Sequence, residues 1–484
     1  LTYDGIETFN VVTAGSTTGS ATRTLTLDSN QLETLNLSGA AGANITVAMQ
    51  GAANVEQVGT VDASEMTGAL LATITAGSSG LLDITGGAGN DTLTIGAMSE
   101  DYTIDGGAGL DTLVVTSAAY DEDSTTGQVG DGVTNVEVLL VSGSADLAAF
   151  SNNTFAALAS AGSATISEIG TEAVSLTMAT AGTTVKLDRA TDGAADEATV
   201  TFGGATEFAV TTLNVADEES LTINSGALIT SGANTIGTLT GTDLTSLTIA
   251  GNRDLTITNA ITGTALAEID ASGLTGTGTA LSINASNSTA DMTVTAGAGV
   301  EESEGDEMNT ITTGRGDDVV TGGAYRDDIT TNNGDDTIDA GDGNNDVNAG
   351  YGDDTITGGA GNDTVDGGNG DDVITGAAGN DSLTGGAGDD SVDGGTGNDI
   401  ISVGAGDDGR QQRVGTAFKT TGVEDVLRNC QLITYLVTST RRGHSDTGNC
   451  ISVVDDNGCD GTVTGTSLSD KLHIGVCIRL SISR

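Results

Sequence analysis

Residues 358–393 read GGAGNDTVD-GGNGDDVIT-GAAGNDSLT-GGAGDDSVD, four consecutive units of nine residues. The same register runs without a slip from Thr313 to the unit that opens at Gly394, ten units in all. Each unit begins with small residues, mostly glycine, and carries an acid or its amide at position six and an aliphatic residue at position eight. A disordered acidic linker has no reason to keep one aliphatic residue in every nine. We therefore expect position eight to be buried in a folded repeat.

The acidic position is the most regular chemical feature of the repeat. Position six is occupied in the ten units by Asp318, Asp327, Asp336, Asn345, Asp354, Asp363, Asp372, Asp381, Asp390 and Asp399, and Asp408 begins an eleventh. Two separate units, at residues 86–94 and 106–114, place Asp91 and Asp111 at the same position. Because a lone unit has no neighbour to stack on, a metal-free Gly-Asp turn explains these two as well as a metal site does.

The residue types of the repeat favour calcium as a ligand. Glycine at positions one, two and four permits a tight turn with positive φ, where a Cβ would clash. Such a turn exposes carbonyl oxygens beside the carboxylate of position six. Oxygen donors without nitrogen or sulfur suit Ca²⁺ better than zinc or copper. Mg²⁺ fits less well, because it needs a small octahedral site and gives up its bound water reluctantly.

Electrostatics strengthens the case for a cation. If units stack as parallel strands, equivalent Asp residues lie about 4.8 Å apart. At an effective dielectric constant near 20, two unit charges at about that distance repel by roughly 3.5 kcal/mol. We therefore expect the repeat to be unfolded without metal and folded with several Ca²⁺ ions.

These units resemble the GGxGxDxUx repeats of RTX (haemolysin-type) calcium-binding proteins. The resemblance implies that two nonapeptides form one coil of a parallel β-roll, with calcium held between turns by position-six side chains and turn carbonyls. It also implies that the nine aspartates at position six from Asp318 to Asp399 are metal ligands and that Asn345 is a weaker one, with Asp408, Asp91 and Asp111 as further candidates. Two departures stand out, since Asn345 has a neutral side chain and Tyr325 replaces the fourth-position glycine of its unit.

The remainder of the chain favours an all-β fold rich in Thr, Ala and Gly. Residues alternate between apolar and polar, as in Leu25-Thr-Leu27 and Leu221-Thr-Ile223, which indicates half-buried strands. Three segments recur in order at offsets of 212, 208 and 210: residues 32–39 as 244–251, 61–68 as 269–276, and 84–89 as 294–299. Such ordered recurrence indicates a duplication. The strands fit a solenoid of stacked coils or a sandwich, followed by the parallel β-roll.

Composition excludes several classes of partner. The net charge of −53 opposes binding to nucleic acid, which is itself anionic. No run of about 18 apolar residues is present, so we expect no transmembrane segment. Histidine is absent before residue 410, and no HExxH, P-loop or CxxC motif occurs. We therefore expect no enzyme activity in this chain, whose start at Leu1 indicates a fragment or a processed product.

Four regions are expected along the chain. Residues 1–150 form a β-rich module that includes the separate units at 86–114, and residues 151–304 form its partial duplicate. Residues 305–408 form the calcium-binding β-roll. Residues 409–484 form an atypical basic tail with all four cysteines (Cys430, Cys450, Cys459 and Cys477), which two disulfides or a zinc site with His444 and His473 would explain. Our hypothesis is that part of this tail is misread or frame-shifted RTX sequence, since Asp470 and Leu472 keep positions six and eight.

The β-rich modules also resemble those of RTX-bearing S-layer proteins and adhesins of Gram-negative bacteria. The strings that carry this resemblance are residues 5–11, 61–64 and 269–278. It implies export by a type I system and an extracellular, cell-surface location. The leading expectation is a structural protein that assembles with copies of itself in a surface array on binding calcium. The alternatives are an adhesin that binds cells or cell-surface polysaccharide, and the stalk of an enzyme or toxin whose catalytic domain lies outside this chain.

Overall fold

The structure is a computed structural model, and the chain divides into two compact units. Unit 1 comprises residues 1–290 and 299–304, and unit 2 comprises residues 291–298 and 305–484. The structure describes residues 7–13, 23–29, 33–40, 43–49, 59–75, 82–98, 101–118, 130–150, 152–170, 174–203, 208–226, 233–275, 280–297, 308–406, 409–411, 437–441 and 444–448. Asp408, the four cysteines and His473 lie outside these ranges.

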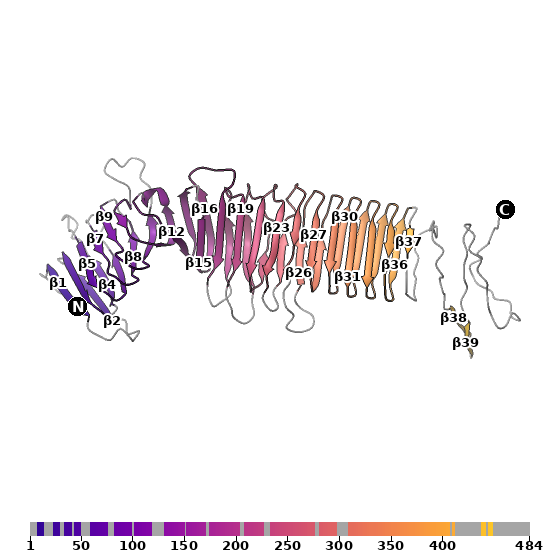
Figure 1. Ribbon diagram of the computed structural model, residues 1–484, viewed down its shortest axis with the longest axis horizontal. Coiled ribbons are helices and arrows are strands. Elements are labelled where there is room, and N and C mark those ends of the chain that lie inside the picture. Colours follow the sequence, from indigo (N-terminus) through magenta and orange to yellow (C-terminus); the bar gives the residue numbers. More distant parts are fainter. Residues whose placement is uncertain are drawn as a thin grey trace. The chain divides into compact units, whose positions relative to one another are not determined.

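Unit 2 is a stack of short parallel strands, and each of the ten nonapeptides contributes one of them. The strands lie side by side in Figure 1, alternately on two faces. They are β25 (Thr293–Thr295), β26 (Met308–Thr312), β27 (Val319–Gly323), β28 (Arg326–Thr330), β29 (Thr337–Gly341), β30 (Asp346–Tyr351), β31 (Thr355–Ala360), β32 (Thr364–Asn369), β33 (Val373–Ala378), β34 (Ser382–Ala387), β35 (Ser391–Asp393), β36 (Ile400–Ala405) and β37 (Gly409–Gln411). A separate antiparallel hairpin joins β38 (Val437–Arg441) and β39 (His444–Gly448).

Two nonapeptides form one coil of unit 2. Each strand pairs in parallel with the strand two places on, so that Thr337 lies beside Thr355 and Thr364 lies beside Ser382. Each step from one coil to the next therefore advances the chain by two nonapeptides. Odd-numbered strands form one sheet and even-numbered strands the other. The coil of two nonapeptides, which the resemblance implied, is confirmed.

The core of unit 2 is a narrow column of aliphatic side chains between the two sheets. Position eight is buried in every unit, as at Ile338, Ile356 and Ile374, each 1% exposed or less. The first residue of the next unit also points inward, as Ala340 and Ala349 do. Positions seven and nine face outward and are mostly Thr, Ser or Asp. One small and one medium apolar residue per strand leave little hydrophobic burial with which to stabilise the fold.

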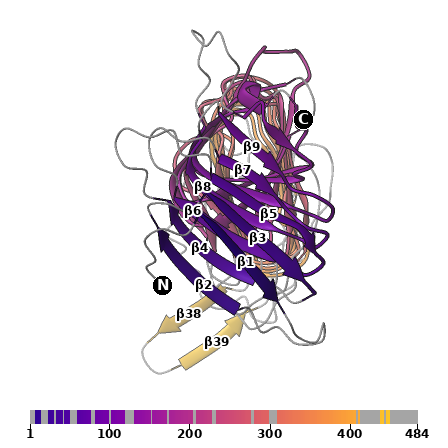
Figure 2. The ribbon, with the colours of Figure 1, turned by 90° about the vertical axis from the view of Figure 1, so that its left-hand side faces the viewer.

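Unit 1 is built in the same way but with coils of uneven length. Figure 2 shows its first strands as two layers, odd-numbered and even-numbered. The coil that brings Thr92 beside Thr112 is shorter than the coil that brings Thr184 beside Thr212. The long strand β12 pairs with β13 through its first half and with β14 through its second.

The strands of unit 1 have the following bounds. They are β1 (Thr8–Thr13), β2 (Arg23–Ser29), β3 (Thr34–Gly39), β4 (Ala43–Met49), β5 (Gly59–Met66), β6 (Leu70–Thr75), β7 (Leu82–Thr85), β8 (Thr92–Ala97), β9 (Tyr102–Asp105), β10 (Thr112–Ala118), β11 (Val133–Thr134), β12 (Val138–Asp146), β13 (Ala157–Ala161), β14 (Ala164–Ile169), β15 (Val174–Thr180), β16 (Gly182–Arg189), β17 (Glu197–Phe202), β18 (Ala209–Asn214), β19 (Ser220–Ser225), β20 (Asn234–Thr240), β21 (Ser246–Gly251), β22 (Leu255–Ile257), β23 (Glu268–Leu274) and β24 (Leu281–Asn284). A single 3-10 turn, η1 (Leu147–Phe150), follows β12.

The duplication seen in the sequence recurs in strand geometry. Strand β3 pairs with β5 and β21 pairs with β23, and both pairs break register at the same place, after Asn36 and after Thr248. In both copies an Asp side chain caps the kink, since Asp62 accepts a hydrogen bond from the backbone N–H of Ser64 and Asp270 from that of Ser272. The two segments therefore share a β-bulge as well as a sequence.

The described fold is all-β with parallel ladders, which confirms the predicted fold class and favours stacked coils over a sandwich. In the described part of the chain, no helix is long and apolar enough to cross a membrane. The four-region division stays a prediction, because the structure separates two compact units and the tail is described only at β37, β38 and β39.

Glycine has two distinct roles in the nonapeptide turn. Positions two and four have positive φ in most units, as at Gly359 (106°) and Gly361 (142°), a region that only glycine enters without cost. Position one, by contrast, shows no such φ at Gly358 or Gly367. The expectation of positive φ at position one was wrong, and the reason for glycine there is the space beside the acidic side chain, described below.

Ala377 provides a test of the turn geometry. It occupies position two with φ of 75°, where an L-residue costs about 1–2 kcal/mol. We expect Ala377→Gly to raise the free energy of unfolding by about 1 kcal/mol in saturating calcium, measured by denaturant unfolding. The neighbouring exposed Ala378 has no positive φ, so Ala378→Gly should lower it instead. Equal effects of the two substitutions would contradict the assigned turn.

Candidate metal centre

The acidic residues of position six are buried at the ends of the turns. Nine aspartates and Asn345 are each 1% exposed or less, directly before the strands that carry the aliphatic core. They fall into two columns, one for each edge of the stack. The first column contains Asp318, Asp336, Asp354, Asp372 and Asp390, and the second contains Asp327, Asn345, Asp363, Asp381 and Asp399.

One side-chain oxygen of each residue joins the coils of its column. Oδ1 of Asp354 accepts the backbone N–H of Asp336 at 2.8 Å, and Oδ1 of Asp372 accepts that of Asp354 at 2.9 Å. The second column repeats the bond, for example from the N–H of Asp363 to Oδ1 of Asp381 at 3.0 Å. These bonds place every carboxylate of a column in the same orientation, one coil above the next.

The other carboxylate oxygen has no protein donor. Among the described residues, no hydrogen-bond partner reaches the buried Oδ2 atoms of Asp318, Asp336, Asp354, Asp363, Asp372, Asp381 and Asp399. A buried, ionised oxygen without a partner loses its hydration without compensation and costs more than the roughly 1–3 kcal/mol of a neutral group. Buried charges in folded proteins are paired or bind metals, so these oxygens mark places for cations.

Carbonyl oxygens border the same space. A Cβ built on Gly358, at position one, would lie 2.6 Å from Oδ2 of Asp363 and 3.0 Å from the carbonyl oxygen of Gly376, one coil on. The space beside Gly376 is similarly bordered by Asp381 Oδ2 and by the carbonyl oxygen of Gly394, the latter at 2.8 Å. Glycine at position one therefore leaves open a small cradle lined by oxygen atoms. Such a cradle fits a hard cation, whose Ca–O distances are about 2.3–2.6 Å.

Burial raises the pKa values of these carboxyl groups. The pKa of Asp354 rises to about 7, through burial first and then through the neighbouring carboxylates of Asp336 and Asp372. Burial likewise raises the pKa values of Asp336, Asp372 and Asp381 to about 6. Without a cation, the stacked fold therefore keeps these acids protonated up to a higher pH than in the unfolded chain.

The described residues contain no group of three or more His, Cys, Asp or Glu side chains that could hold a metal by themselves. The donors that meet at each turn are instead a carboxylate oxygen and backbone carbonyls. A donor set made of oxygen alone is the chemistry of calcium sites.

Comparison with known families agrees with this chemistry. Residues 83–97 and the overlapping segments 305–338, 312–347, 339–374, 348–383 and 375–409 match the family model described as the RTX calcium-binding nonapeptide repeat (4 copies). The chain carries RTX repeats. These repeats bind Ca²⁺ at several sites, so calcium is the cofactor of this chain. No curated protein matches the chain.

Asp327 and Asn345 differ from the seven aspartates of the RTX array that have an open oxygen. Both carboxylate oxygens of Asp327 accept hydrogen bonds, Oδ2 from the N–H of Gly323 and Oδ1 from Nδ2 of Asn309. Asn345 has an amide nitrogen where the aspartates have Oδ2. The assignment of Asp408 remains a prediction, because that residue lies outside the described ranges.

The two separate RTX-like nonapeptides of unit 1, at residues 86–94 and 106–114, are neighbours in space. Strands β8 and β10 pair in parallel, and Oδ1 of Asp111 accepts the N–H of Asp91 at 2.7 Å, as in the array. The premise that these units have nothing to stack on was therefore wrong. Oδ2 of Asp111 is buried without a described partner, whereas both oxygens of Asp91 accept backbone N–H groups, those of Leu70 and Gly87. Only Asp111 of this pair shares the open oxygen of the array.

Glu137 extends the Asp91–Asp111 ladder by one coil. Its Oε2 accepts the N–H of Asp111 at 2.7 Å. Sequence reasoning missed this residue, because it lies far beyond Asp111 in the chain and belongs to no nonapeptide. The only sequence signal was its place directly before the apolar run Val138–Val141.

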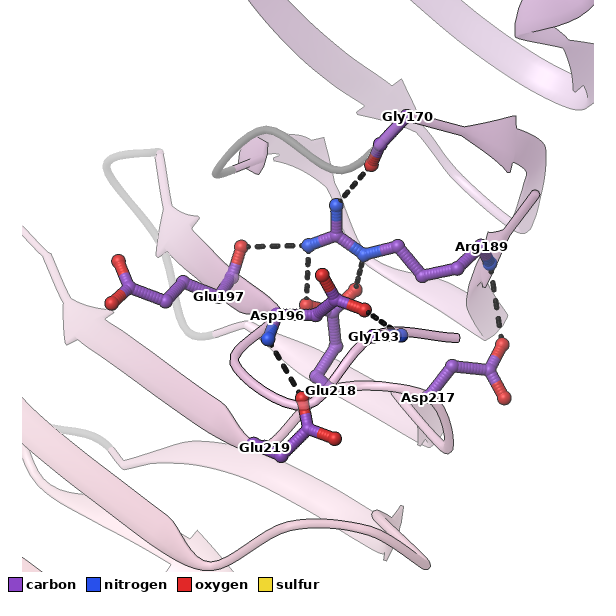
Figure 3. A network of polar contacts seen from close by, with 8 residues as sticks. All are labelled: Gly170, Arg189, Gly193, Asp196, Glu197, Asp217, Glu218 and Glu219. Atoms are coloured by element: carbon purple, nitrogen blue, oxygen red, sulfur yellow. Dashed lines mark hydrogen bonds and ion pairs between the residues drawn. The ribbon is translucent and has the colours of Figure 1, made fainter. Parts of the chain in front are cut away.

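Unit 1 also shows how the chain stabilises a buried acid with its own cation. Glu218 is 1% exposed, and its carboxylate accepts bonds from Nε of Arg189 at 2.8 Å and Nη2 at 2.6 Å (Figure 3). Arg189 also donates to the carbonyl oxygens of Glu197 and Gly170. Burial raises the pKa of Glu218, and the contact with Arg189 opposes that rise. In the RTX array the described columns contain no comparable arginine or lysine.

The pKa shifts predict how pH affects the metal-free protein. The folded pKa values of Asp354 (about 7) and Asp372 (about 6) lie above the ordinary value of 3.8, so the folded state binds more protons between those values. Stability of the metal-free fold must then fall as pH rises through this window. We expect protein dialysed free of metal to show more β-structure by far-UV circular dichroism at pH 5 than at pH 7.5.

The same comparison at saturating calcium is the control. There the carboxylates must be ionised to bind the metal, so acid should weaken the fold instead. If the circular dichroism signal of β-structure in the metal-free protein is constant or grows from pH 5 to pH 7.5, the raised pKa values of these aspartates are contradicted.

Proposed function

We propose that this chain is a calcium-dependent structural protein of the cell surface, whose RTX array folds and assembles outside the cell. The ligands are the open Oδ2 atoms of the array together with turn carbonyls. They belong to Asp318, Asp336, Asp354, Asp363, Asp372, Asp381 and Asp399, with Asp390 in the same column and Asp111 as a further ligand in unit 1.

The observation that carries this proposal is the set of buried carboxylate oxygens without a described donor. Each would be a site of uncompensated charge in a core that has one medium aliphatic residue per strand. Calcium, when bound, supplies the positive charge that holds neighbouring coils together. The array's own residues orient the donors, since the N–H to Oδ1 bonds fix each carboxylate. Beside Asp363, Asp372, Asp381 and Asp399, glycine at position one keeps the cradle open.

An extracellular location is supported by the concentration of calcium outside cells. Extracellular calcium modules bind at about 10⁻⁴–10⁻³ M, far above the calcium level of the cytosol. An array that stays unfolded at low calcium can be exported as an extended chain and fold on arrival. The similarity of the array to RTX proteins supports export by a type I system.

A structural role is supported by the regular outer surface of the array. One edge carries an exposed carboxylate in each coil, and each is joined to the next by a bond such as that from the N–H of Asp353 to Oδ1 of Asp335 at 2.8 Å. The opposite edge carries asparagines in the same arrangement: Asn344, Asn362, Asn380 and Asn398. Contacts that repeat coil after coil suit an array of identical copies better than a single catalytic cleft.

The assembly of the full chain tests this function. We expect addition of calcium at about 1 mM, with magnesium as the control, to convert small particles into ordered sheets, followed by light scattering and electron microscopy. A chain that folds on calcium but stays monomeric would contradict the array. In that case, binding of the calcium-loaded chain to cell-surface polysaccharide would identify an adhesin.

A further inference from the structure

The second column of the RTX array differs from the first at its N-terminal end. We infer that the side-chain amide of Asn345 occupies the place of a calcium ion, so that the neighbouring coils that carry Asp327 and Asn345 are joined without metal. This inference rests on the ligand assignment proposed above.

The orientation of the Asn345 amide follows from its hydrogen bonds. Its Oδ1 accepts the backbone N–H of Asp327 at 2.9 Å, the bond that joins every coil of the column. The reverse orientation would place an NH₂ group against that N–H, two donors facing each other. Nδ2 must therefore point to where the aspartates have their open Oδ2.

The Asn345 amide donates to the carbonyl oxygens that line its turn. Nδ2 lies 3.2 Å from the carbonyl oxygen of Gly358 and 3.4 Å from that of Gly341. Gly358 opens the unit one coil on from Asn345, just as Gly376 opens the unit one coil on from Asp363. At Asp363, the equivalent carbonyl borders the open cradle. The two N–H groups of the Asn345 amide thus donate to the carbonyl oxygens that would otherwise coordinate a cation.

The neighbouring residue of the column is also satisfied by protein groups. Asp327 accepts the N–H of Gly323 at 2.8 Å through Oδ2 and Nδ2 of Asn309 at 2.7 Å through Oδ1. Asn309, Asp327 and Asn345 therefore form a continuous series in which amide donors replace metal. The open oxygens of this column begin only at Asp363. The first column has open oxygens at Asp318, Asp336, Asp354 and Asp372, so the two columns bind unequal numbers of ions.

A single substitution should convert the Asn345 step into a calcium site. Asn345→Asp replaces the donor NH₂ with an oxygen beside the Gly358 carbonyl. We expect the full chain to bind about one more Ca²⁺ per molecule, counted by equilibrium dialysis and elemental analysis, and to lose more β-structure in chelator. Asn344→Asp is the matched control, since it adds the same charge at an exposed position of the same unit. An unchanged calcium count in Asn345→Asp would overturn the inference.

Asp363→Asn separates this inference from the ligand assignment. Asp363 belongs to the same column and has an open oxygen, so its substitution should lower the calcium count by about one. If Asp363→Asn leaves the count unchanged, the proposed ligands are wrong and the inference fails with them. If Asp363→Asn lowers the count but Asn345→Asp does not raise it, only the inference fails.

Asp327→Asn provides a second readout should Asn345→Asp fail to fold. An amide nitrogen at residue 327 would face the donors Gly323 N–H or Asn309 Nδ2, so the midpoint of denaturant unfolding should fall. The calcium count should stay the same, because Asp327 has no open oxygen. A lower count in this variant would show that Asp327 binds calcium and would overturn the inference.

Discussion

Repulsion between buried carboxylates is the constraint on which the RTX array depends. Successive aspartates of a column are held one coil apart by N–H to Oδ1 bonds, in an interior that excludes water. At about 4.8 Å and an effective dielectric constant near 20, each such contact costs roughly 3.5 kcal/mol. Burial of the aliphatic residue at position eight stabilises the fold by about 1.5–3 kcal/mol. This gain must also offset the conformational entropy that the chain loses on folding. With cations bound between the turns, the net free energy of closing the array becomes favourable instead of unfavourable.

The rest of the array follows from the need to bring oxygen atoms together around such cations. Glycine at positions two and four turns the chain through positive φ, as at Gly359 and Gly361, while glycine at position one leaves space beside the carboxylate. A constant coil of two nonapeptides keeps every turn in register with the next. Unit 1 has coils of uneven length and satisfies the buried acid Glu218 with a protein donor, Arg189, whereas its Asp111 has an open oxygen like those of the array. On this account, the same strand architecture is stabilised mainly by hydrophobic burial in unit 1 and by calcium in the array of unit 2.

The sequence predicted the regular features of this structure well. Position eight is buried and position six faces the turn because a strict period of nine leaves few alternatives, and charge plus glycine indicated calcium. What it could not predict depends on contacts between coils. Asp327 and Asp363 are identical in sequence position, yet Asn309 lies beside one and not the other. The stacking of Asp91 on Asp111 required a coil longer than two nonapeptides, which two lone motifs do not reveal. The bonds of Asn345 depend on the Gly358 carbonyl, which belongs to a different coil.

The central claim is that calcium, not hydrophobic burial, closes the RTX array. Far-UV circular dichroism of the full chain during a calcium titration, with magnesium as the control, tests it most directly. The account predicts a gain in β-structure with calcium near the roughly 10⁻⁴–10⁻³ M typical of extracellular modules, and little gain with magnesium. A spectrum that is already fully β in chelator at neutral pH and does not respond to calcium would contradict it.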